Sequence, residues 1–148
     1  MSRTFIAATL AATVVALPVG FLLYGVLFAE LFAEGAITIT GVMREQPDIA
    51  WILLGQLPFA ALVTLVVQWR GDTSFLGGAR SGATLGLLMA VGYDFAQYGT
   101  THLWTLTATL VDPLISAVLV STAGGVAAMV LQRGGTEVRE PGEPASSH

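Results

Sequence analysis

The sequence predicts an all-α membrane protein, a transmembrane four-helix bundle with both chain termini in the cytoplasm. Its 148 residues are 54% hydrophobic and 11% charged, whereas about 25% of the residues of a soluble domain are charged. Four apolar segments are long enough for helices, which need about 20 residues to cross a bilayer core of about 30 Å. Extended strands would leave an open edge without hydrogen-bond partners in lipid, so the segments must be helical.

The four predicted spans form one membrane domain over residues 1–133. In chain order they cover residues 5–28, 49–69, 81–98 and 106–131. A cleaved signal peptide is the other interpretation of the first span, with Arg3 as its charged region. The apolar run is far longer than the usual length of about 7–15 residues, which favours a retained helix. Residues 134–148 are polar and contain prolines, so they are expected to form a disordered cytoplasmic tail.

The arginines predict how the spans are oriented. Those that flank the spans on one side are Arg3, Arg70, Arg80 and Arg133, and only Arg44 falls on the other side. Cytoplasmic segments of membrane proteins carry the excess of Lys and Arg. Both termini and the connection between the second and third spans are therefore expected in the cytoplasm.

Composition and motifs exclude several classes of protein. The chain has no Cys, so disulfides and thiolate ligands are absent, and a zinc site is not expected. Its net charge of −4 is unlike the basic face of a nucleic-acid-binding protein. The phosphate-loop, HExxH and GxSxG motifs are missing. We therefore expect neither an enzyme nor a bound cofactor or metal, and the expected surroundings are the lipid bilayer.

Asp94 and Asp112 are the main candidate functional residues, because each lies inside a predicted span. A carboxylate at membrane depth costs roughly 2.5–3.5 kcal/mol on insertion scales, which makes it a functional hypothesis. At about 1.5 Å per residue, Asp94 lies roughly 6 Å and Asp112 about 9 Å below the outer ends of their spans. Tyr24 and Gln56 fall about 6–10 Å deep by the same arithmetic, and Gln97 shares a helix face with Asp94. The sequence thus predicts an outer polar layer whose oxygen atoms suit a proton or a hard cation.

Asp112 also has a structural interpretation. It stands directly before Pro113, and Asp as the N-cap before a proline is a common helix start. The fourth span would then begin at Pro113 and still extend about 28 Å. Asp48 is predicted to cap the second span in the same way. Asp94 is harder to explain as a cap, because the helical pattern continues on both sides of it, although a partner hydroxyl could satisfy it.

Small residues mark a packing face on the third span. Gly78, Gly82 and Gly86 recur every four residues, and this spacing lets two helix backbones approach closely. We expect these glycines to pack helices within one bundle. A homodimer face is the alternative, and a partner membrane protein is the other partner that the sequence leaves open.

Three segments carry a resemblance to a known family. They are FLLYGVLF at 21–28, GLLMAVGYDFAQY at 86–98 and LTATLVDP at 106–113. In these motifs the chain resembles small bacterial four-helix membrane proteins of unknown function, of the DUF1761 kind, and the likeness covers all four spans. It implies a multi-pass protein of the bacterial inner membrane and supplies no catalytic residues. Asp94 and Asp112 match the acidic positions of that pattern.

Two functions remain open at this point. The first is a small transport or permeation protein for a proton, a cation or another small solute, with Asp94 as the carrier and Asp112 and Gln56 assisting. The second is a non-catalytic membrane subunit or interaction module, in which the polar layer only holds the helices together.

Overall fold

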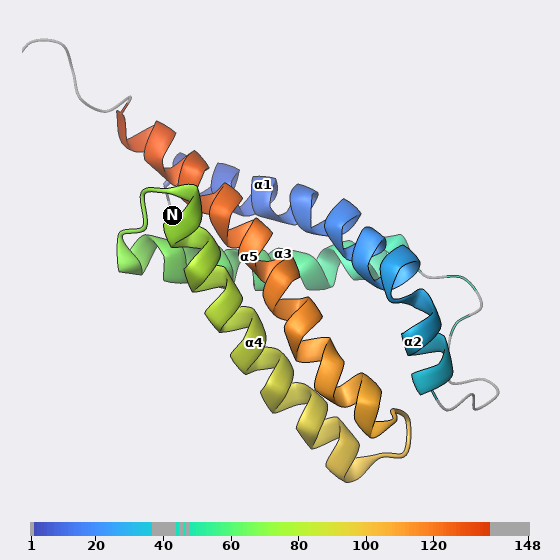
Figure 1. Cartoon of the computed structure of the whole chain (residues 1–148). Helices are drawn as coiled ribbons and strands as arrows, with labels where there is room; N and C mark the ends of the chain where they lie inside the picture. The colour runs from blue at the N-terminus through green and yellow to red at the C-terminus, as the bar shows by residue number, and fades with distance from the viewer. Residues whose placement is uncertain (1, 37–43, 45, 47, 137–148) are drawn as a thin grey trace, which may run out of the picture.

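The structure is a computed structural model that describes residues 2–36, 44, 46 and 48–136. Over these residues the chain is all-helical, with one isolated β-bridge between Ala36 and Trp104 as its only extended pairing (Figure 1). The elements are α1 (Arg3–Gly20), the π-helix η1 (Phe21–Leu27), α2 (Ala29–Gly35), α3 (Ile49–Arg70), α4 (Phe75–Thr100) and α5 (Leu106–Thr136). The first three residues of the predicted disordered tail, 134–136, instead form the end of α5, and the rest of the tail lies outside the described residues.

The first predicted span is one continuous helical segment whose backbone changes from α-helix to π-helix near its C-terminal end. Ser2 starts it, because its hydroxyl accepts the N–H of Phe5 at 3.2 Å. Pro18 lacks an N–H and so interrupts the α-helical hydrogen bonds. The wider turns of η1 follow and end where the Phe28 N–H donates to the Leu23 carbonyl at 2.9 Å. The short helix α2, which the sequence had not predicted, then turns away from the axis of α1 (Figure 1).

The starts of α3 and α4 follow ordinary capping rules. The Ala50 N–H donates to Asp48 Oδ1 at 3.1 Å, which confirms the predicted cap of the second span. α3 ends at Gly71, whose φ of 67° lies in the left-handed region that glycine adopts without a steric penalty. Ser74 then caps α4 by accepting the Gly77 N–H at 3.0 Å.

The start of α5 contradicts one interpretation of the sequence. The helix begins at Leu106 and continues through Pro113, so the alternative in which Asp112 caps a helix starting at Pro113 is wrong. Thr105 provides the cap instead, since its hydroxyl accepts the Ala108 N–H at 3.4 Å. Asp112 is consequently an interior helix residue whose side chain is directed toward neighbouring helices.

α5 is the central helix of the fold. It packs against α4 as an antiparallel pair, while α1 and α3 cover its other sides (Figure 1). The helices approach closely because their contacting residues are small. One cluster of buried side chains joins α1, α3 and α5 and consists of Ala8, Ala12, Ala60, Ala123 and Ala127. A second joins α3 and α5 through Val63, Val67, Val120 and Ala128.

The contact of α4 with α5 depends on the predicted glycine stripe. A Cβ atom added at Gly78 would lie 2.2 Å from the Gly124 carbonyl oxygen, and one at Gly82 would lie 2.2 Å from the Val120 carbonyl oxygen. Gly86 is similarly enclosed by α5. Such distances are far inside van der Waals contact, so side chains larger than hydrogen are excluded. In the structure the stripe packs two helices of one chain, and this face is therefore not available to a second copy.

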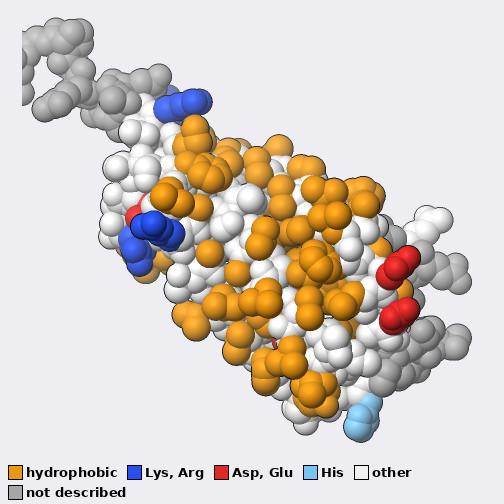
Figure 2. Space-filling model, viewed as in Figure 1, with side chains coloured by type: hydrophobic (Ala, Val, Ile, Leu, Met, Phe, Trp, Pro, Cys, Tyr) orange, Lys and Arg blue, Asp and Glu red, His pale blue; other side chains and the backbone are white. Residues whose placement is uncertain are grey.

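The surface has the character of a membrane protein. Three segments are long and apolar enough to cross a bilayer: Arg3–Leu27, Ile49–Arg70 and Leu106–Gly134. The third predicted span lies within α4, which is not among them because its glycines and polar side chains make it less apolar. Figure 2 shows a broad hydrophobic band between an end that carries basic side chains and an end that carries acidic side chains and a histidine.

Candidate functional site

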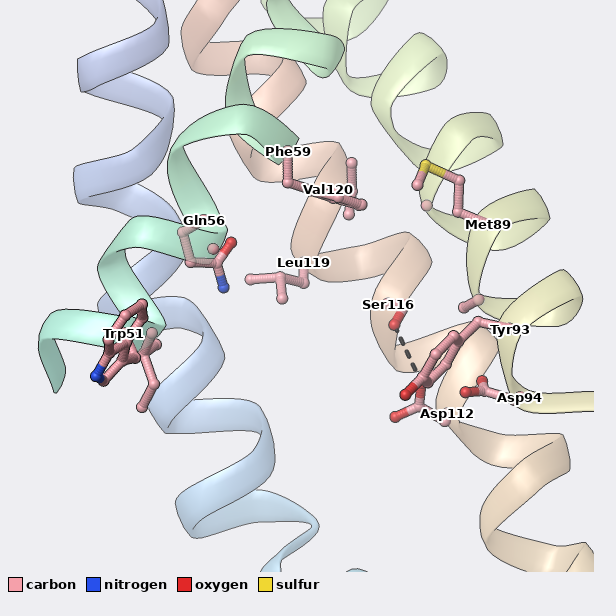
Figure 3. A pocket seen from close by; sticks show the side chains of 14 residues that line it. Trp51, Gln56, Phe59, Met89, Tyr93, Asp94, Asp112, Ser116, Leu119 and Val120 are labelled. Atoms are coloured by element: carbon pink, nitrogen blue, oxygen red, sulfur yellow. Dashed lines mark hydrogen bonds between the residues drawn. The ribbon is translucent and has the colours of Figure 1, made fainter. Parts of the chain in front are cut away.

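The carboxyl groups of Asp94 and Asp112 lie side by side where α4 packs against α5 (Figure 3). Both border a small pocket beside Trp104 and also a larger cavity. Asp112 accepts a hydrogen bond from the Ser116 hydroxyl at 3.3 Å. Asp94 Oδ2 is buried and finds no hydrogen-bond donor among the described residues. Two carboxylates so close repel each other when both are ionised, so a shared proton or a bound cation stabilises the pair.

Tyr24 approaches the pair from η1. Its hydroxyl lies 3.0 Å from the Ser116 hydroxyl. A serine hydroxyl has a single proton, and that of Ser116 is directed at Asp112, so Tyr24 donates to Ser116. The resulting chain of hydrogen bonds runs from η1 to Asp112 on α5. Ser116 had not been predicted as a site residue, although its position four residues after Asp112 places the two on one helix face.

The two glutamines differ in their relation to the site. Gln56 lines the larger cavity from α3, on the opposite wall from the carboxyl pair (Figure 3). Gln97 does not join it, because its amide donates to the Tyr93 hydroxyl at 3.2 Å on the same helix. The prediction that Gln97 belongs to the polar layer is thus not reproduced by the contacts of its side chain. The position of Gln97 on the same helix face as Asp94 did not determine which neighbouring group its amide would bond to.

The larger cavity has a volume of about 680 Å³ and lies between α3 and α4, with α5 as its floor. Most of its lining is apolar or aromatic. Trp51 and Phe59 line it from α3, and Met89 and Tyr93 line it from α4 (Figure 3). The carboxyl pair is therefore the charged feature of a mostly apolar space.

Aromatic rings border the pair on the side away from this cavity. Phe32 of α2 lies between Tyr24 and Trp104, with ring-centroid distances of 5.1 and 6.2 Å. The Thr105 N–H donates to the Gly35 carbonyl at 2.9 Å and fastens α2 to the start of α5. These contacts hold the short helix α2 beside the carboxyl pair.

The site has few side chains that could act as metal ligands. Among the described residues, no group of three or more His, Cys, Asp or Glu side chains is placed to hold a metal ion. The atoms that surround the carboxyl pair are hydroxyl oxygens, an indole ring and apolar carbons. This arrangement suits a proton or a weakly hydrated cation better than a strongly hydrated divalent ion, which requires six or more oxygen ligands.

Comparison of the chain with protein-family models, with curated proteins and with solved structures finds no match. The resemblance to small bacterial four-helix membrane proteins therefore stays a prediction.

Proposed function

We propose that this chain is a multi-pass protein of the bacterial inner membrane that carries a proton or a cation at Asp94 and Asp112. The observation that supports this function is a pair of adjacent carboxyl groups, one with an oxygen that has no described donor, on the wall of an apolar cavity. Placing acidic groups at such a depth is costly. Exchange of a proton or a cation is a function that explains why acidic groups are retained at this depth. We propose no enzymatic activity.

The proposal includes α4 as a fourth span. Its 26 residues extend about 39 Å, which is enough to cross a bilayer. Ser81 is buried and Asp94 is half-buried within the bundle, so the lower hydropathy of α4 is compatible with a membrane position. The ends of α1, α3 and α5 that carry arginine meet around one pocket, which the connection between α3 and α4 also lines. By the excess of positive charge, that end and both termini face the cytoplasm.

Within the pair the two carboxyl groups have different roles. Asp112 accepts a hydrogen bond from the Ser116 hydroxyl, which in turn accepts one from Tyr24. Asp94 lacks such a donor at its buried oxygen, and we assign it the uptake of the proton or cation. Gln56 faces the pair across the cavity and can bind water or the solute on its way.

The test is ion flux through the full chain reconstituted in liposomes. Asp94→Asn is expected to abolish the change in internal pH or ion concentration that the unaltered protein produces. The expression level and oligomeric state should stay unchanged. Glu34→Gln is the matched control, because it removes an exposed carboxylate outside the site. An Asp94→Asn protein with full flux would contradict the assignment.

A non-catalytic subunit or interaction module is the second candidate. The observation that favours it is the hydrogen bond from Tyr24 to Ser116, which ties η1 to α5 without requiring any ligand. On this view Asp94→Asn is silent in every flux assay and loosens the bundle in detergent. A partner membrane protein or a second copy would then associate through a face other than the glycine stripe.

A further inference from the structure

The cavity beside the carboxyl pair opens sideways between two helices. α3 and α4 both rest on α5, yet they contact each other over only a short stretch. The residues at its mouth are exposed on the molecular surface, with Trp51 at 65% and Tyr93 at 66% exposure. These positions lie on the hydrophobic walls of the helices, so the mouth faces the lipid and a ligand could enter it from the bilayer.

The size and lining of this cleft suit an organic molecule. Its volume of about 680 Å³ falls within the range of roughly 300–1,000 Å³ that is typical of sites for small molecules. Gly55 adds to the open space on α3, because a Cβ atom placed there would meet nothing within 4 Å. Apolar and aromatic side chains provide most of the surface that a ligand would touch (Figure 3).

The charged residues of the cleft determine which charge its ligand carries. Of the described residues that line it, two are carboxylic acids and none is basic. An anionic ligand would be repelled, and a neutral one would leave the repulsion between the carboxylates uncompensated. The faces of aromatic rings such as Trp51 and Tyr93 attract cations as well. A strongly hydrated inorganic ion gains little from such walls, whereas an organic cation gains from both the rings and the acids.

We propose that the cleft between α3 and α4 binds a lipophilic organic cation, an amine or quaternary onium group on an apolar body, with its charge beside Asp94 and Asp112. This inference rests on the proposed function and names the class of substrate for the same carboxyl pair. The apolar body would lie against Phe59 and Met89, and the ligand would enter from the bilayer through the mouth between the two helices.

The experiment is a calorimetric titration of the full chain in neutral detergent with tetraphenylphosphonium. The neutral probe of similar shape is triphenylphosphine oxide. We expect saturable binding of the cation and binding of the neutral probe that is weaker by about tenfold or more, since the neutral probe has no charge to pair with the two carboxylates. Equal binding of the two probes, or no binding of the cation, would overturn the proposal.

Two variants separate the cleft from the carboxyl pair. Gly55→Leu fills open space in the cleft without touching the acids, and Gly92→Leu is its matched control, since a Cβ at Gly92 also meets nothing within 4 Å and this residue does not line the cleft. Gly55→Leu should weaken binding of the cation by about tenfold or more, and Gly92→Leu should leave it unchanged. Unaltered binding to Gly55→Leu, or equal losses in both variants, would contradict binding in the cleft.

Failure of this inference differs from failure of the proposed function. If Asp94→Asn abolishes ion flux while tetraphenylphosphonium does not bind, the carboxyl pair carries a small ion and the inference is wrong. If tetraphenylphosphonium binds as described while Asp94→Asn leaves the flux intact, the cleft is a binding site and the permeation function is wrong.

Discussion

Asp94 is the residue whose surroundings are least complete. Its Oδ2 atom is buried without a donor among the described residues, and the neighbouring side chain that faces it is another acid. A buried acceptor without a partner costs roughly 1–3 kcal/mol. Structures retain such a group where a ligand or a proton completes it, which is the reason for placing the uptake step at Asp94.

Replacing Asp94 should therefore separate stability from function. The amide of Asp94→Asn can donate to the Asp112 carboxylate and removes one of two repelling charges, so we expect a higher melting temperature in detergent together with the loss of flux. Thermal unfolding followed by circular dichroism measures the first effect, with Glu34→Gln as the control. A lower melting temperature with no change in flux would instead favour the interaction-module function.

Ser116 is expected to contribute through its two hydrogen bonds. Ser116→Ala interrupts the chain between Tyr24 and Asp112 and should lower the free energy of unfolding by roughly 0.5–1.5 kcal/mol. Ser121→Ala is the matched control on the same helix, because the Ser121 hydroxyl only donates to the Val118 carbonyl one turn earlier. The measurement is chemical unfolding in mixed micelles. Equal effects of the two substitutions would contradict a specific role for Ser116.

At the scale of helices, the pairing of α4 with α5 depends on backbone contact rather than on large side chains. Gly78 and Gly82 bring the α4 backbone against carbonyl groups of α5. This close approach brings Asp94 near Asp112, since it fixes both the distance and the rotation of the two helices. The glycine stripe and the acidic pair are thus parts of one arrangement.

Widening this contact should disturb both the fold and the site. Gly82→Ala places a Cβ atom 2.2 Å from the Val120 carbonyl oxygen and should destabilise the protein by roughly 1–3 kcal/mol, the usual cost of overpacking. Gly92→Ala meets nothing within 4 Å and should be neutral or slightly stabilising, because alanine favours helices over glycine. Unfolding in detergent compares the two variants, and equal stabilities would show that the contact tolerates a methyl group.

At the scale of the whole molecule, charge is segregated along the helix axes. Basic side chains gather at one end of the hydrophobic band and acidic ones at the other (Figure 2). The carboxyl pair lies closer to the acidic end, near α2 and the connection between α4 and α5. Such a distribution favours one orientation in a membrane whose cytoplasmic side retains positive charge.

Cysteine labelling tests this orientation and the fourth span together. The chain has no Cys of its own, so a single introduced thiol reports one position. Thr73→Cys precedes α4 and His102→Cys follows it. If α4 crosses the membrane as proposed, an impermeant maleimide added to intact cells labels His102→Cys and spares Thr73→Cys until the cells are opened. Labelling of both positions from one side would show that α4 does not cross.

Part of the site could be predicted from the sequence, because depth along a helix is a matter of counting residues. Counting placed Tyr24, Asp94 and Asp112 at one level, and the structure brings their side chains to one region. Rotation about the helix axes could not be counted in this way. It is decided by packing, which turns Gln97 toward Tyr93 and brings Ser116 between Tyr24 and Asp112.

The sequence by itself determined the four long helical segments, the cap at Asp48 and the small-residue face on α4, because hydrophobic length, capping chemistry and residue spacing are local properties. Only the tertiary structure decided that α5 continues through Pro113, that η1 departs from the α-helix and that α3 and α4 leave a cleft between them. These features depend on how each helix meets α5, and such contacts join residues far apart in the chain.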